Sequence, residues 1–363
     1  MDISKGRYWD KPWSLVDGCT PCSPGCEHCW AASMAHRFVR EGEPGHDAPI
    51  LTEYDGSFIH DAPQFNGVVI PRPDRLDIPL KRRKPTVYSV WNDLFHEDVQ
   101  DEFLFDALNV MERCSEGPAW GERVYQYQFD TTGSFVPHTF LILTKRARRM
   151  AYKVDEWLSS YSEQGTAANI AHIYFGLTVC NQQEADEKIP AFLQVPGKKF
   201  LSIEPMLGPV DITQIRDGHT RDHVTINALT GIPYDWDYDE ENPDDRTGKI
   251  NAVILGGETG PGARPMHPDW VRSIRDQCEA AGVPFFFKQW GEFEPWDHRK
   301  GTDAVPNVLY VPYRPDCPDP YPLGWGRRVG RNKAGRLLDG REHNDLPWGP
   351  PPTQPENEEL TRE

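Results

Sequence analysis

Short apolar runs recur along the chain, and most are followed by a polar cluster and then by a stretch of helical periodicity. Such runs, bounded by turn signals, are typical of strands buried on both faces, as in a parallel sheet. Their alternation with helices of about a dozen residues predicts βα units. The predicted strands cover residues 13–18, 86–91, 139–144, 173–179, 199–205, 251–258 and 283–291.

Helices are expected after most of these strands. They cover residues 29–40, a stretch ending near Arg113, and residues 145–161, 180–194 and 267–282. Six or seven βα units fit a full or partial barrel better than a small doubly wound sheet, which remains the alternative. We therefore predict an α/β protein with a partial (β/α)6-type TIM-like barrel over residues 1–291.

Several segments interrupt this rhythm. Loop-rich insertions are expected at about 41–66, 115–137 and 216–249, the last of them acidic. Residues 292–344 are expected to form an extension that packs on the barrel. Residues 345–363 have the proline and acid content of a disordered tail. No apolar run has the length of a membrane helix, and the first residues lack a signal-peptide core, so we expect a cytoplasmic protein without membrane contact.

The net charge of −17 argues against a general duplex-binding surface, because phosphate attraction dominates nonspecific affinity. Basic residues nevertheless cluster at 81–84, 145–149 and 326–336. Each cluster alone is typical of a solvated face. Together they leave room for a local site that accepts a phosphate-bearing substrate.

Polar residues and glycines gather where the predicted strands end. In barrels, the loops after the strands' carboxyl ends build the active site, so this placement predicts a polar pocket. Each residue alone has a structural explanation, such as capping a helix or forming a tight turn. The set comprises Asn92, Asp93, Lys145, Thr178, Cys180, Glu204, Gly256, Gly257, Glu258 and Lys288.

Four cysteines, Cys19, Cys22, Cys26 and Cys29, lie within eleven residues directly after the first predicted strand. In a reducing cytosol such a cluster favours metal ligation over disulfides. The spacing is too short for a zinc ribbon, although three cysteines with His28 or His36 would suffice for one zinc ion. Iron–sulfur ligation fits closely spaced thiolates better. We expect Cys19 to be a packing residue.

The C-x3-C-x2-C triplet of Cys22, Cys26 and Cys29, followed by Trp30, resembles the signature of the radical S-adenosylmethionine (SAM) superfamily. Together with "LSIEPMLGP" and "GGETGPGARPMHPDWVRSIRDQC", it further resembles a three-cysteine-motif family of radical-SAM-like proteins found largely in bacteriophages and prophages. The resemblance spans roughly residues 8–343. It implies a partial (β/α)6 barrel and a [4Fe–4S] cluster held by the triplet, with an open iron that binds SAM.

The resemblance also implies roles for the residues at the strand ends. The SAM-binding candidates are Trp30, Asn92, Asp93, Thr178, Glu204, Gly256 and Gly257. Their place at the predicted mouth makes Cys180, as a hydrogen-atom donor, Lys145 and Glu204 candidates close to the substrate, although a free cysteine is more commonly a small buried hydrophobic residue. Two features depart from the superfamily pattern: His28 replaces the usual aromatic residue before the last cysteine, and the Gly-Gly-Glu sequence follows the sixth strand rather than the second.

The leading hypothesis is therefore a radical SAM enzyme with isomerase- or transferase-type chemistry, reduced by flavodoxin or ferredoxin, in the host cytoplasm if phage-encoded. The resemblance favours a nucleotide or locally bound DNA as substrate, for example a rearrangement in a hypermodified thymine, with Trp91 and Trp290 available for base stacking. The runner-up is a non-catalytic zinc or iron–sulfur interaction module. A third hypothesis is a metal-dependent hydrolase that uses Asp93, Glu204 and Glu258.

Overall fold

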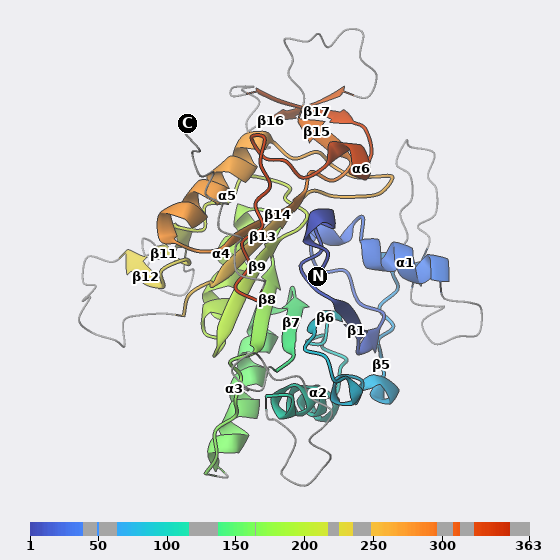
Figure 1. Ribbon diagram of the computed structural model, residues 1–363, viewed down its shortest axis with the longest axis vertical. Coiled ribbons are helices and arrows are strands. Elements are labelled where there is room, and N and C mark those ends of the chain that lie inside the picture. The colour runs from blue at the N-terminus through green and yellow to red at the C-terminus, as the bar shows by residue number, and fades with distance from the viewer. Residues whose placement is uncertain are drawn as a thin grey trace, which may run out of the picture.

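A seven-stranded parallel sheet, curled into a half-barrel, forms the centre of the molecule (Figure 1). The computed structural model describes residues 1–38, 49–50, 64–115, 137–163, 165–216, 225–234, 248–295, 308–312 and 323–348. The strands of the sheet are β1 (Lys11–Ser14), β6 (Val87–Trp91), β7 (Thr139–Thr144), β8 (Ile173–Thr178), β9 (Lys198–Ile203), β13 (Ala252–Gly256) and β14 (Phe285–Gln289).

The order of the strands across the sheet follows their order in the chain, β1-β6-β7-β8-β9-β13-β14, and every neighbouring pair is parallel. The predicted series of seven strands is thus confirmed. A doubly wound sheet reverses its strand order at a switch point, and this sheet does not, so the doubly wound alternative is wrong. The first strand also lies earlier than predicted: Val16–Asp17 form a separate strand, β2, which pairs antiparallel with β5 (Ile70–Pro71).

The helices after the strands cover the convex face of the sheet. They are α2 (Asp101–Arg113), α3 (Ala147–Glu163), α4 (Gln182–Leu193) and α5 (Pro268–Ala281). Helix α3 shows the underlying pattern: Met150, Val154 and Trp157 recur on one face at helical spacing, and all three are buried in the main core. Helix α1 (Trp30–Phe38) instead follows the cysteine-bearing segment and contacts the small strands β3 (Pro49–Ile50) and β4 (Gln64–Phe65).

Aromatic side chains fill the amino-terminal half of the concave face. Side chains alternate between the two faces of a strand, which places Tyr174 and Phe200 on this inner side, where they cluster with Tyr8 and Trp348. The rings of Tyr174 and Trp348 are 4.7 Å apart, and Trp348 Nε1 donates to the Tyr8 carbonyl at 2.9 Å. Residues near the start of the chain and residues 345–348 together close this side of the half-barrel. The tail expected from residue 345 therefore begins with packed residues, and residues 349–363 lie outside the described residues.

The segment after β14 forms a three-stranded antiparallel sheet in the order β15-β17-β16, followed by α6 (Arg331–Ala334). Figure 1 places this sheet at one end of the molecule and helices α2 and α3 at the other. The chain then returns to β14, where Phe287 N donates to the His343 carbonyl at 3.0 Å. The strands are β15 (Phe293–Pro295), β16 (Val308–Pro312) and β17 (Leu323–Arg328).

Parts of the expected insertions, residues 39–48, 51–63, 116–136, 217–224 and 235–247, lie outside the described residues. The described part of the third insertion contributes to a small antiparallel sheet of β10 (Ile215–Arg216), β11 (Thr225–Asn227) and β12 (Ile232–Tyr234). The described residues also include four short 3-10 helices: Ile3–Lys5, Pro24–Cys26, Pro73–Arg75 and Pro79–Lys81. None of the described helices is long and apolar enough to cross a membrane.

Candidate functional site

The cysteine loop, residues 19–29, lies at the carboxyl edge of the sheet. Ser14, the last residue of β1, pairs with Trp91, the last residue of β6, so the chain enters the loop at the edge where barrels place their chemistry. Within the loop, Gly25 N donates to Ser23 Oγ at 3.1 Å and stabilises the start of the 3-10 helix. All four cysteines of the loop are free thiols.

The three thiols of the triplet differ in their surroundings. A hydrogen bond between the Cys22 and Cys26 side chains lowers the pKa of Cys26 and raises that of Cys22. Burial raises the pKa of Cys29, while the amides of Ala31 and Ala32 at the start of α1 oppose this rise. The loop thus already contains one thiol that favours the thiolate form, which is the form that binds metal.

Cys19 stands apart from the triplet in its packing. It lies against a small apolar cluster formed by Ala32 and Phe65, and burial raises its pKa to about 11. A buried thiol with a raised pKa behaves as a small hydrophobic residue rather than as a nucleophile.

Lys145, which directly follows β7, lies among the cysteines. Burial lowers its pKa, but the thiols of Cys26, Cys180, Cys29 and Cys22 outweigh burial and raise it, so Lys145 carries a positive charge in their midst. The fold therefore brings a predicted strand-end residue together with all three cysteines of the triplet.

Cys180 lies underneath the cysteine loop. It is fully buried, its Sγ is 3.5 Å from Ser23 Oγ, and burial raises its pKa to about 11. A Cβ atom at Gly25 would come within 2.5 Å of Cys180 Sγ, so this glycine is needed for the loop to approach β8 closely. These contacts are those of a packing residue.

Arg146 holds one side of the cysteine loop. Its guanidinium donates to Asp93 Oδ2 at 2.7 Å, to Glu97 Oε2 at 2.6 Å and to the Thr20 carbonyl at 3.3 Å. Thr144 Oγ1 donates to the other oxygen of Asp93 at 2.6 Å. The Asp93 carboxylate is thus occupied by protein partners, and it acts on the loop through Arg146 rather than by facing open space.

Arg264 holds the opposite side. It donates to both carboxylate oxygens of Glu258, at 2.8 and 2.6 Å, to Glu27 at 2.7 Å and to the Pro24 carbonyl at 2.9 Å. Glu258 is only 5% exposed, and a bidentate arginine is the usual way to satisfy such a buried carboxylate. Two arginines, each paired with a buried acid, therefore fix the loop on the sheet.

Polar side chains line the carboxyl-terminal half of the concave face, beside the loop. Lys288 Nζ lies 2.9 Å from Glu204 Oε1, and Ser202 Oγ donates to Glu204 Oε2 at 3.2 Å. Burial, together with the nearby charge of Glu204 and a hydrogen bond to it, raises the pKa of Tyr8 well above its usual value. Thr178 pairs in register with Ser202 and is buried on the same face.

The glycines assigned to SAM have different surroundings. A Cβ at Gly256 would come within 2.7 Å of Glu204 Oε1, so this glycine leaves room for the carboxylate on the concave face. At Gly257 a Cβ would come within 2.1 Å of the Trp290 carbonyl, so close backbone packing alone requires glycine there. Asn92 adopts a left-handed backbone with φ of 61° and donates from Nδ2 to the Val16 carbonyl at 2.5 Å.

Trp91 and Trp290, the tryptophans predicted for base stacking, differ in their surroundings, and Trp91 lies beside the SAM candidate Trp30. Trp290 is buried and donates from Nε1 to the Leu337 carbonyl at 2.9 Å, so its expected place at the mouth is wrong: the extension after β14 covers it. Trp30 is 48% exposed, and its ring lies 5.0 Å from the ring of Trp91. These two residues border the cysteine loop.

The carboxylates proposed for a hydrolase do not converge. Asp93, Glu204 and Glu258 are paired with three different cations, Arg146, Lys288 and Arg264 respectively. In the described part of the chain, no group of three or more His, Cys, Asp and Glu side chains, the cysteines of the loop included, is arranged to hold a metal ion. A two-metal or single-metal hydrolase needs such convergence, so the geometry does not favour this hypothesis.

The donor set fits a [4Fe–4S] cluster better than a single zinc ion. Ligands of one zinc must converge at tetrahedral positions, whereas the thiolates of a cubic cluster bind different irons. Three free thiols on one loop, grouped around the cation of Lys145, suit an anionic cluster. His28, a zinc alternative, packs against Gly262, whose Cβ would come within 2.3 Å of the ring; its Nδ1 is buried with no hydrogen-bond partner among the described residues.

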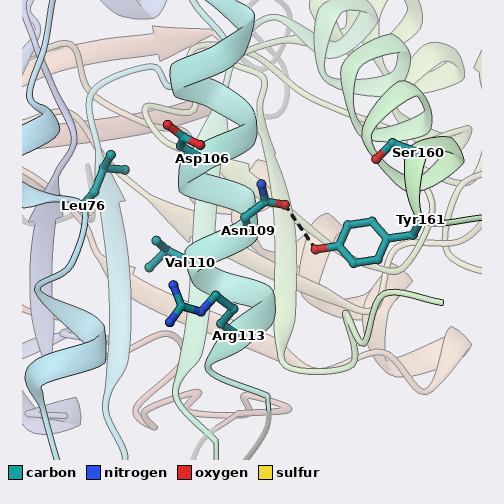
Figure 2. Close-up of a pocket in the computed structure, with 7 residues that line it drawn as sticks. All are labelled: Leu76, Asp106, Asn109, Val110, Arg113, Ser160 and Tyr161. Carbon is teal, nitrogen blue, oxygen red and sulfur yellow. Dashed lines mark hydrogen bonds between the residues drawn. The ribbon is translucent and has the colours of Figure 1, made fainter. Parts of the chain in front are cut away.

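A separate cleft of about 550 Å³ lies between α2 and α3 (Figure 2). Its central feature is Asn109, whose Oδ1 accepts hydrogen bonds from Trp157 Nε1 at 2.8 Å and Tyr161 OH at 3.1 Å. Helices of βα units run antiparallel to their strands, so the carboxyl ends of α2 and α3 lie at the amino edge of the sheet. The cleft is therefore remote from the cysteine loop and lies at the edge that usually serves stability.

Sequence reasoning missed the residues that position the loop. Arg146 was noted only within a basic cluster, and Arg264 only within the glycine-rich stretch after β13. The sequence signal for these arginines was weak. Arg264 follows its acidic partner, Glu258, by six residues, whereas Arg146 meets Asp93 only in the folded chain. The pattern of charges along the chain does not assign such partners.

Comparison with known proteins gives a family and no activity. Residues 4–118 and 121–347 match the family described as "Protein of unknown function (DUF5131)", and the chain belongs to it. No curated protein and no solved structure matches the chain. The function must therefore be argued from the site.

Proposed function

We propose that this protein is a radical SAM enzyme, with Cys22, Cys26 and Cys29 as the ligands of a [4Fe–4S] cluster. The observation that carries the proposal is the C-x3-C-x2-C loop of three free thiols at the carboxyl edge of a parallel half-barrel, within electrostatic reach of Lys145. When bound, the cluster supplies the electron that cleaves SAM to methionine and a 5′-deoxyadenosyl radical, which takes a hydrogen atom from the substrate. We infer accordingly that the half-barrel is the partial (β/α)6 barrel of that superfamily.

Residues of this chain would compensate the charge of the cluster, position the cysteine loop and bind SAM. Lys145 offsets the negative charge of the thiolates, and Arg146 and Arg264 hold the loop in place. The paired charges of Glu204 and Lys288 match the ammonium and carboxylate groups of the methionine part of SAM. We place SAM at this pair, next to Trp30 and on the face that carries Thr178 and Gly256.

The aromatic residues in the other half of the concave face form a floor beneath this polar region. Tyr8, Tyr174, Phe200 and Trp348 pack into one buried cluster on this side of the half-barrel. Exclusion of water protects a reactive intermediate from side reactions. The electron comes from a small reductant such as flavodoxin or ferredoxin, and we place the reaction in the cytoplasm.

Anaerobic reconstitution tests the proposal. The purified full-length protein is incubated with iron and sulfide, reduced with dithionite and supplied with SAM, and 5′-deoxyadenosine is measured. We expect product from the wild type and from Cys278→Ala, which removes a buried cysteine of α5, and none from Cys26→Ala. Zinc in the protein as isolated, with no cluster formed on reconstitution, would instead support the interaction-module hypothesis.

A further inference from the structure

A second cleft, of about 260 Å³, lies where the first residues of the chain meet the strand β6. Two of its acids are already engaged: Asp10 accepts from the Val87 amide at 2.8 Å and pairs with the terminal amino group, and Asp2 pairs with Lys5 at 3.0 Å. The cleft is lined by Met1, Asp2, Arg7, Trp9, Asp10, Lys11, Arg82, Lys84, Pro85 and Thr86.

Three of the four basic residues of this cleft are exposed; the fourth, Arg82, is half-buried and donates to Thr86 Oγ1 at 2.6 Å. Arg7, Lys11 and Lys84 all face solvent, and none of them forms a salt bridge with another described residue. The other basic clusters are neutralised in part: Arg146 pairs with Asp93 and Arg336 pairs with Glu342, whereas Arg331 and Lys333 form no salt bridge with another described residue. In a chain with a net charge of −17, this cleft is a local positive site.

A series of tryptophans connects the cleft with the cysteine loop. The Arg7 guanidinium lies 5.2 Å from the centre of the Trp9 ring, and Trp9 lies edge-to-face with Trp91 at 5.7 Å. Trp91 contacts Trp30 edge-to-face at 5.0 Å, and Trp30 directly follows Cys29. Trp30 is almost half exposed at the end of this series, so its side chain is accessible to a ligand.

We propose that the cleft and the tryptophan series bind single-stranded nucleic acid, with phosphates at Arg7, Lys11 and Lys84 and a base stacked on Trp30. Cations that follow the backbone and aromatic rings that stack on bases are the two components of single-strand recognition. The acidic remainder of the surface repels phosphate and confines the strand to this path. The proposal rests on the proposed function only for the fate of the base at the cysteine loop, since binding itself needs no cofactor.

The test is the binding of fluorescein-labelled oligo(dT) to the full-length protein as purified, followed by fluorescence anisotropy at several KCl concentrations. Each phosphate contact contributes about 0.7 to the slope of log K against log salt for a single strand. We expect Lys11→Ala with Lys84→Ala to weaken binding and to reduce this slope by about 1.4. Trp30→Ala should weaken binding about fivefold to a hundredfold without changing the slope, because stacking is not ionic.

The control removes one positive charge at Arg113, an exposed arginine of the α2–α3 cleft (Figure 2), and is compared with Lys84→Ala alone, which removes one charge at the proposed site. Arg113→Ala should bind as the wild type does. Equal weakening by Arg113→Ala and the lysine variants would reduce the effect to net charge and overturn the proposal. Absence of binding at low salt, or displacement of the oligonucleotide by dTMP as effectively as by unlabelled oligo(dT), would also overturn it.

The binding and cleavage assays fail independently. Formation of 5′-deoxyadenosine without oligonucleotide binding would refute the nucleic-acid-binding proposal and support the radical SAM proposal. Salt-sensitive binding that depends on Trp30, in a protein that forms no cluster, would refute the radical SAM proposal and support the nucleic-acid-binding proposal. Thermal melting of each variant confirms that it is folded before either assay is interpreted.

Discussion

The two halves of the concave face are built from the same strands and yet differ in chemistry. In the amino-terminal half, the inward positions carry large apolar groups such as Tyr174, Phe200 and Phe286. Two to four residues further along the same strands, the inward positions carry Thr178, Glu204 and Lys288. The change takes place within a single face, so it reflects position along the strand: one edge stabilises the barrel, and the other is available for chemistry.

The two halves are also held together differently. Burial of aromatic surface stabilises the amino-terminal half, where it is worth about 25 cal/mol per Å² removed from water. The cysteine loop at the other edge depends on two arginine–carboxylate networks. Buried ion pairs add little net stability but are costly to break, so they are suited to fixing one geometry.

The largest expected effect comes from the cysteines themselves. Cys22→Ala and Cys29→Ala each remove one thiolate of the triplet and should abolish cluster formation, measured as iron per protein and as absorbance at about 400 nm after reconstitution. Cys19→Ala, which removes a packing thiol of the same loop, should retain the cluster. Loss of iron in Cys19→Ala equal to that in Cys22→Ala would show that the triplet is not the ligand set.

Truncation of Trp348 tests the apolar half of the concave face separately from the cysteine loop. Trp348→Ala removes a buried ring that contacts Tyr174 and Phe200, and should lower the free energy of unfolding by about 3–5 kcal/mol. Urea denaturation measures this change. Iron incorporated per folded protein should stay at the wild-type level, and a parallel loss of iron would contradict the separation of the two halves.

Loss of the Arg264 contact with Glu258 should have a smaller effect, shared between stability and cluster formation. Arg264→Ala leaves a buried carboxylate without its partner and should cost about 1–3 kcal/mol of stability together with part of the cluster. Adding Glu258→Gln removes the unpaired charge, so the double variant should recover stability without recovering iron. Recovery of both together would show that Arg264 acts only on stability.

The smallest effect concerns pH and the amino edge of the sheet. Burial lowers the pKa values of His138 and His172, which precede β7 and β8. Below the unfolded value of about 6.5, the unfolded chain binds more protons than the folded one, so stability should fall as the pH decreases from about 6.5. The slope is at most about 1.4 kcal/mol per pH unit for each histidine. Urea titrations between pH 5 and pH 7 measure it, and His172→Gln should reduce it.

Much of the fold follows from local pattern, and the strands show why. Each predicted run from β6 to β14 is present, because apolar periodicity and turn signals are properties of short segments. The first strand lies earlier than predicted, since the run from Trp13 to Val16 has the pattern of one strand, but Val16 and Asp17 pair with β5 instead. Pairing choice is a long-range property that the pattern does not contain.

The candidate site was predictable only in part. The triplet of cysteines and the polar strand ends were found because their spacing is local. The partners of Asp93 and Glu258 were not, and both acids turned out to hold the loop through arginines. Trp290 was expected at the mouth, but a segment more than forty residues further along the chain covers it.

The sequence by itself determined the order of strands and helices, the free cysteine triplet and the edge of the sheet at which it lies. Only the tertiary structure decided that Lys145 stands among the thiols and that Cys180 lies beneath Ser23, 157 residues away along the chain. It also joined Trp348 to Tyr8 across 340 residues, closing the apolar half of the barrel. The reason is physical: helix and strand patterns are set by neighbouring residues, whereas these contacts exist only once the sheet has curled and brought its distant segments together.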